Sequence, residues 1–145
     1  MGTKRHVLVD GRGTPLAVVA TGANRHDVSQ LELVLDTIVI DRPEPTPDRP
    51  QNLCADKAFD SGYARDAMTD RGYTPHVRSR GEERREKAST PSHRARRWVV
   101  EATHSWMNRF RKILVRFEKT DRSYLGLLHL ACALIAWRKA VPIYG

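Results

Sequence analysis

The sequence of 145 residues has only two cysteines, Cys54 and Cys132, and they are far apart. Neither belongs to a closely spaced pair of the kind that binds zinc, and two cysteines are too few for a disulfide-stapled scaffold. Because each lies in an apolar segment, we expect two reduced and buried thiols.

Long hydrophobic runs are also missing from the chain. The most apolar stretch, 125–137, is interrupted by Gly126 and His129 and is too short to span a membrane. No signal-peptide core follows the first six residues. We therefore expect a cytoplasmic protein with no membrane partner.

Acidic residues are outnumbered, 17 against 25 lysines and arginines, which gives a formal net charge of +8. The excess is confined to 76–119, and the rest of the chain is neutral. A localised positive field is typical of proteins that bind a polyanion. The alternative, an arginine-rich solvated surface, explains the composition well and its segregation poorly.

The apolar pattern predicts a β-hairpin near the N-terminus, with strands over 6–10 and 16–21 and turn residues at 11–15. A helix should follow over 31–38, with Asp27 as its N-cap and Gln30 completing a capping box. Four prolines within 41–52 predict an exposed connector.

The second part of the chain alternates strands with helices. Strands are expected over 53–56 and 73–77, and between them a helix over 61–71 that begins at Asp60 as N-cap and ends at Gly72. The charged stretch 80–96 predicts a mobile basic loop, followed by helices over 98–117 and 124–139. This order indicates a layered α/β fold with later strands mostly parallel and the last helix on the sheet.

The expected helix over 98–117 has two distinct faces. One carries the apolar residues Trp106, Met107, Phe110, Ile113, Leu114 and Phe117. The other places Glu101 in a row of cations and polar groups. Two simpler interpretations of Glu101 remain open: an ion pair with Arg97 at i−4, and half of a di-iron site with His104 at i+3, for which no second half is found.

Asp56 ends an apolar strand, where it either caps the following turn or belongs to a site at the sheet edge. Considered together, Asp56 and Glu101 suggest a metal site. Magnesium or manganese prefers carboxylate oxygens, and two ions about 4 Å apart activate the attacking oxygen and stabilise the leaving oxygen in phosphoryl chemistry. Arginines around such a site would hold DNA phosphates.

Four passages carry a resemblance to a known family: 4–10 (KRHVLVD), 21–27 (TGANRHD), 55–60 (ADKAFD) and 97–119, which begins RWVVE. In this order the chain resembles the C-terminal half of the DDE transposases of bacterial insertion sequences, in the insertion-sequence-five group. The resemblance implies a ribonuclease-H-like fold and a two-metal site, with Asp56 as the second Asp, Glu101 as the Glu and Arg97 as the signature arginine.

The chain departs from this family at three places. Related groups have tyrosine at position 94 and lysine at position 108, where this chain has Arg94 and Asn108. The family's first Asp and the strand that carries it should lie upstream. Asp10 is not a substitute, because an Asp-Gly pair there is ordinary turn chemistry. We therefore expect a single incomplete catalytic domain over 1–145 that lacks the first strand.

The resemblance implies DNA strand cleavage and transfer in transposition, by a bacterial protein associated with the nucleoid. With one ligand missing, the chain alone should be inactive; the alternative function is non-specific DNA binding without catalysis. Expected partners are DNA at the element ends and target, and an upstream-encoded segment; self-association remains open. Expected DNA-binding residues are Arg94, Arg96, Arg97, His104, Asn108, Arg109, Arg111, Lys112 and Arg116.

Overall fold

The computed structural model describes residues 2–77 and 97–144, so the expected loop over 80–96 lies outside the described residues. These residues form two compact units. One unit contains 1–25, 33–40 and 98–145, and the other contains 26–32 and 41–97. Both mix helices with strands, which confirms the α/β class; each sheet has two strands.

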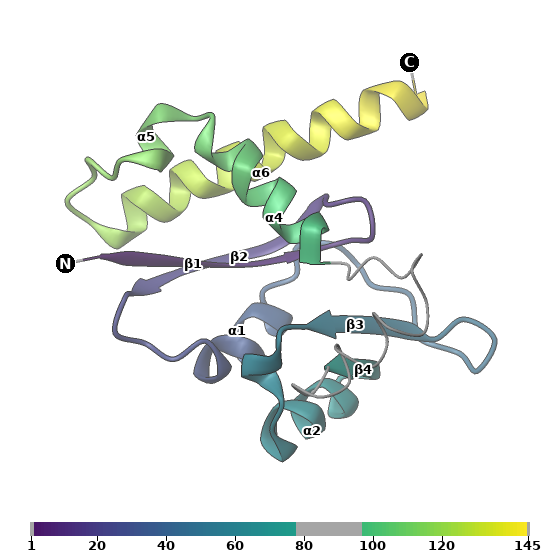
Figure 1. Ribbon diagram of the computed structural model, residues 1–145. Coiled ribbons are helices and arrows are strands. Elements are labelled where there is room, and N and C mark those ends of the chain that lie inside the picture. The colour runs from purple at the N-terminus through teal and green to yellow at the C-terminus, as the bar shows by residue number, and fades with distance from the viewer. Residues whose placement is uncertain (1, 78–96, 145) are drawn as a thin grey trace, which may run out of the picture. The chain divides into compact units, whose positions relative to one another are not determined.

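The first unit is built on the hairpin that the sequence predicts (Figure 1). Strand β1 (Thr3–Val9) pairs antiparallel with β2 (Pro15–Gly22), and a bulge interrupts the register between Leu8 and Val9. Asp10 shapes the turn, because its Oδ1 accepts hydrogen bonds from the backbone N–H groups of Arg12 and Thr14, both at 2.8 Å. Asp10 is therefore a turn residue, as expected.

Alternate residues of the hairpin contact different cores, as the two-residue period of a strand requires. Val7 and Val18 pack with the C-terminal helices, whereas Leu8 and Val19 pack with Val34 of helix α1 (Leu31–Asp36). The hairpin thus has two buried faces within its own unit.

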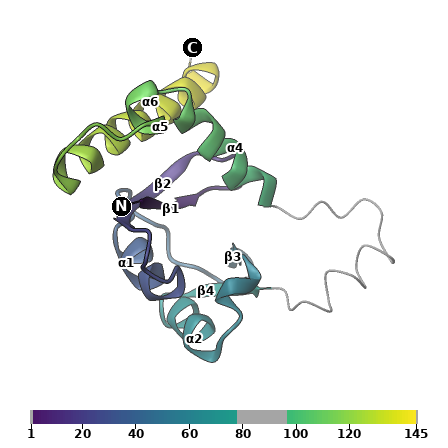
Figure 2. The same ribbon diagram turned by 60° about the vertical axis from the view of Figure 1, so that its left-hand side comes forward.

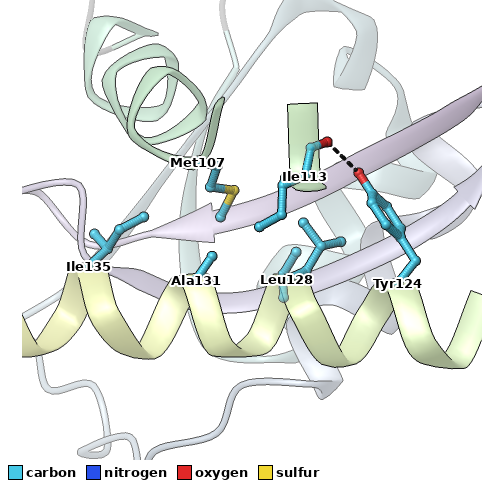
Figure 3. Close-up of a cluster of buried hydrophobic side chains, with 7 residues drawn as sticks. Met107, Ile113, Tyr124, Leu128, Ala131 and Ile135 are labelled. Carbon is cyan, nitrogen blue, oxygen red and sulfur yellow. Dashed lines mark hydrogen bonds between the residues drawn. The ribbon is translucent and has the colours of Figure 1, made fainter. Parts of the chain in front are cut away.

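Helix α6 (Asp121–Tyr144) supplies most of the larger core (Figure 3). Leu128, Ala131 and Ile135 lie in line along it and pack against Met107, and the Tyr124 hydroxyl donates to the Ile113 carbonyl at 3.3 Å. Burying large aliphatic side chains contributes roughly 1.5–3 kcal/mol each. The expected packing of the last helix on the hairpin is confirmed, although the helix is longer than 124–139.

By length and composition α6 is also apolar enough over Asp121–Pro142 to cross a bilayer, with a mean hydropathy of 1.3. A core helix passes the same test, and one face of α6 packs in the core described above. The outer face carries Leu130, Leu134, Trp137 and Val141, all exposed. These four residues are spaced by four, three and four positions, which places them in one stripe.

The second unit has a βαβ arrangement (Figure 2). Strand β3 (Gln51–Ala55) pairs in parallel with β4 (Tyr73–Val77), and between them lie the short 3₁₀ helix η2 (Lys57–Phe59) and helix α2 (Gly62–Asp70). The predicted parallel pairing is confirmed. Before β3, the proline-bearing stretch is mostly exposed and has one isolated bridge, between Thr46 and Arg49.

Three local predictions are wrong. Ser61, not Asp60, caps α2, since its hydroxyl accepts from the Ala64 N–H at 3.2 Å, and Asp60 instead pairs with Arg65 at 2.8 Å. Asp27 forms no capping box, because the segment enters the helix through the 3₁₀ turn η1 (Val28–Gln30). Of the two thiols expected to be buried, Cys54 is exposed, since it lies on the outward side of β3, and Cys132 is half-buried.

The predicted helix over 98–117 is also wrong in its length. Helix α4 (Arg97–Asn108) ends early, and a separate four-residue helix α5 (Arg111–Leu114) follows. Phe110 has extended backbone angles, φ −85° and ψ 105°, which break the helical path. As a result Leu114 and Phe117 are exposed instead of continuing the apolar stripe, while Met107 and Ile113 remain buried.

Candidate functional site

Asp56 lies at the carboxyl end of β3, in the extended conformation that precedes η2. Its Oδ1 accepts a hydrogen bond from the Lys57 N–H at 2.6 Å. One carboxylate oxygen of Asp56 therefore caps the following turn, as one of the two interpretations of this residue expects. The side chain is exposed. A carboxylate held at a strand end with its surface open to solvent is suited to bind a hard cation.

Hydrogen bonds from Arg65 hold together the helix and the strand that follow Asp56, α2 and β4. Arg65 of α2 donates both to Asp60 and to the carbonyl of Val77 at the end of β4, each at 2.8 Å. This arginine ties the helix to the carboxyl end of the neighbouring parallel strand. The loop that carries Asp56 is thereby braced within the second unit.

Glu101 lies in the middle of α4, in the first unit, and is exposed. One and two turns further along the same helix are His104 and Asn108, both half-buried. Ser105 also faces solvent. This polar face of α4 therefore exists over 101–108, but it ends where the helix ends.

A contact that sequence reasoning missed joins this face to the hairpin. Arg5 of β1 donates through Nη2 to the Oδ1 of Asn108 at 2.8 Å. The pKa of His104 lies below its usual value because the imidazole is partly buried and, second, because the Arg5 cation is close. Residues 103 positions apart in the sequence gave no pattern that could have revealed this pair.

The cations expected to bind DNA fall into three groups. Arg94 and Arg96, and the side chain of Arg97, lie outside the described residues. Arg109, Arg111 and Lys112 are exposed at the break between α4 and α5. Arg116 is half-buried, pairs with Asp121 at 2.7 Å and donates to the Thr3 hydroxyl at 2.7 Å.

The structure thus brings together Glu101, His104 and Asn108 on one helix and places Asp56 in the other unit. Within the described residues there is no group of three or more His, Cys, Asp or Glu side chains placed to hold a metal ion. Chemically, the exposed carboxylates of Asp56 and Glu101 fit a divalent cation.

Comparison with known proteins identifies the class of protein. The family model of the transposase DDE domain matches residues 1–136, and the chain belongs to this family. Members of the family generally use divalent metal ions. No solved structure matches the chain at a significant level.

Two relatives show the same kinship. The chain is 40% identical over 139 residues to a protein of Burkholderia cepacia that is named as a transposase for insertion sequence element IS402. The matched region covers 94% of this chain and 63% of that protein. It is 28% identical over 137 residues to a protein of Brucella ovis that is named as a transposase for insertion sequence element IS6501. That matched region covers 93% of this chain and 98% of the relative. The chain therefore spans less than two thirds of the IS402 relative.

Proposed function

We propose that this chain acts in the transposition of an insertion sequence of the insertion-sequence-five group, in metal-dependent cleavage and transfer of DNA strands. The observation that carries the proposal is the family match over 1–136. The proposed fold of the assembled domain is ribonuclease-H-like. Its proposed location is the bacterial cytoplasm, at the nucleoid.

Asp56 and Glu101 are the proposed metal-binding and catalytic carboxylates. Two Mg²⁺ or Mn²⁺ ions, when bound, would activate the attacking oxygen and stabilise the leaving oxygen of the DNA strand. The chain's own contribution is to hold one carboxylate at the end of β3 and one on α4. A third carboxylate, proposed to come from an upstream-encoded segment, completes the set.

Metal binding gives a direct test of the two carboxylates. Mn²⁺ binding to the chain, followed by electron paramagnetic resonance, should weaken at least several-fold in Asp56→Asn and in Glu101→Gln. Asp70→Asn is the matched control, since Asp70 is also an exposed carboxylate, at the end of α2. Equal binding by all four proteins would rule out the proposed ligands.

A second candidate function, DNA binding without catalysis, is favoured by the exposed cations Arg109, Arg111 and Lys112. Phosphate contacts release counterions, so affinity for DNA of any sequence should fall steeply as salt rises. Under this alternative the chain binds DNA but does not cleave it in the presence of Mg²⁺. The double variant Asp56→Asn, Glu101→Gln should then bind DNA as tightly as the unmodified chain. Cleavage of element-end DNA by the chain alone would refute this alternative.

Self-association is proposed for the outer stripe of α6, formed by Leu130, Leu134, Trp137 and Val141. Their alternating spacing of four and three is that of the apolar positions of a helix–helix pair. In sedimentation velocity, Leu134→Glu should lower the dimer fraction, whereas Arg122→Glu at the start of the helix should not. A chain that is monomeric at all concentrations would contradict this proposal.

A further inference from the structure

Arg5 is a half-buried cation without a charge partner. Among the described residues it forms no ion pair, and its hydrogen bond goes to the neutral amide of Asn108. Its other terminal nitrogen, Nη1, is buried and has no hydrogen-bond partner in the described part of the chain. Buried charged groups are costly unless an anion or acceptor compensates them.

A pocket lies next to this charge. Arg5 lines a pocket of about 600 Å³ formed by the start of β1, by α5 and by the start of α6. Lys119 also lines the pocket, and so does Arg116, whose charge is neutralised by Asp121. Among the described residues, two cations that line the pocket, Arg5 and Lys119, therefore form no ion pair with a carboxylate.

From β1, the Arg5 guanidinium also contacts the polar face of α4 through Asn108. Asn108, which it contacts, is seven residues beyond Glu101, or about 10 Å along a helix that rises about 1.5 Å per residue. Successive phosphates of a DNA strand are about 3.4 Å apart along the duplex axis. On a DNA strand that runs along α4, a phosphate at Arg5 would thus lie roughly three nucleotides from the position of Glu101.

We propose that Arg5, positioned by Asn108, binds a backbone phosphate of a DNA strand that runs along α4 past Glu101. This inference rests on the proposed function. Arginine suits the role because its planar guanidinium carries several N–H donors, so that it can keep its hydrogen bond to Asn108 and also donate to a phosphate oxygen.

Glu118 lines the same pocket, and its Oε2 is buried with no hydrogen-bond partner among the described residues. A carboxylate there repels a phosphate. Replacing it should therefore act in the opposite direction from replacing Arg5, since Glu118→Gln removes a negative charge and keeps the shape of the side chain.

The test measures the affinity of the chain for a DNA duplex as a function of salt concentration. Arg5→Gln should reduce the slope of log affinity against log salt by roughly 0.9, the value for one lost phosphate contact. Arg122→Gln, the same charge change at an exposed residue outside the pocket, should leave the slope unchanged. Glu118→Gln should tighten binding.

A rescue variant separates phosphate binding from a structural role. Asn108→Lys in the Arg5→Gln background returns a cation to the same place from α4, and should restore the slope. If Arg5→Gln lowers only the melting temperature and keeps the slope, the inference is wrong. If the unmodified chain shows no salt-dependent DNA binding at all, the proposed function itself is wrong. That outcome is distinct from a failure of the Arg5 inference alone, in which the chain binds DNA and Arg5→Gln keeps the slope.

Discussion

The hydroxyl of Thr103 donates to the carbonyl of Gly13 at 2.7 Å, and this bond joins α4 to the turn of the hairpin. Thr103 is completely buried, and the two residues are 90 positions apart. The same helix carries Glu101 two residues earlier. The bond thus fixes the glutamate-bearing helix against the strands of its own unit.

Removing this hydrogen bond should destabilise the protein. Thr103→Val keeps the shape of the side chain but leaves the buried Gly13 carbonyl without its donor, at a cost of about 1–3 kcal/mol. Thr103→Ser keeps the hydroxyl and should cost less, about 1 kcal/mol for the lost methyl group. Urea unfolding followed by circular dichroism measures both; a serine variant less stable than the valine variant would contradict the assignment.

Gly13 should not tolerate a side chain. Its φ is +81°, and an added Cβ would lie 3.0 Å from the Thr103 hydroxyl and 3.3 Å from the Val99 carbonyl. Gly13→Ala should therefore cost about 1–3 kcal/mol, from backbone strain and crowding together. Gly11→Ala is the control in the same turn, since nothing lies within 4 Å of its Cβ position. Equal unfolding free energies for the two variants would be inconsistent with this packing.

The two thiols should react at very different rates. Cys54 is exposed, whereas burial raises the pKa of Cys132 to about 11. At pH 8 only about a thousandth of the Cys132 side chain is the reactive thiolate. Titration with a thiol-specific chromophore should show one fast and one slow thiol, and Cys54→Ser should remove the fast phase alone. Two fast thiols in the folded protein would contradict the raised pKa and partial burial of Cys132.

Stability should decrease as the pH falls below 6.5, in part because of His104. Burial and the Arg5 cation lower the pKa of this imidazole below the usual 6.5, so near that pH the unfolded chain binds more protons than the folded one. The contribution of the neutral His104 to the free energy of unfolding is complete above about pH 6.5. It is lost as the pH falls towards the pKa of His104 in the folded state.

His104→Gln isolates this contribution, since the other histidines are unchanged. Between pH 7.5 and 5.5 the variant should lose less stability than the unmodified protein, as measured by thermal unfolding at each pH. The same loss in both proteins would show that His104 protonates as easily in the fold as in the unfolded chain.

Local sequence patterns determined much of this protein: the hairpin with its Asp10 turn, the parallel strands around α2, the stop at Gly72 with φ +75°, and the core face of α6. They succeeded because turn chemistry and apolar periodicity act over a few residues. Quoted motifs also identified the family, which the match over 1–136 shows.

Tertiary structure decided the rest. The apolar residues keep helical spacing from 98 to 117, but the chain leaves the helical path at Phe110. There the packing of Ile113 against α6 outweighs the local helix propensity. The exposure of Cys54 depended on which face of β3 is covered. The contacts of Arg5 with Asn108 and of Thr103 with Gly13 join residues 103 and 90 positions apart, and only the folded chain brings such residues within hydrogen-bonding distance.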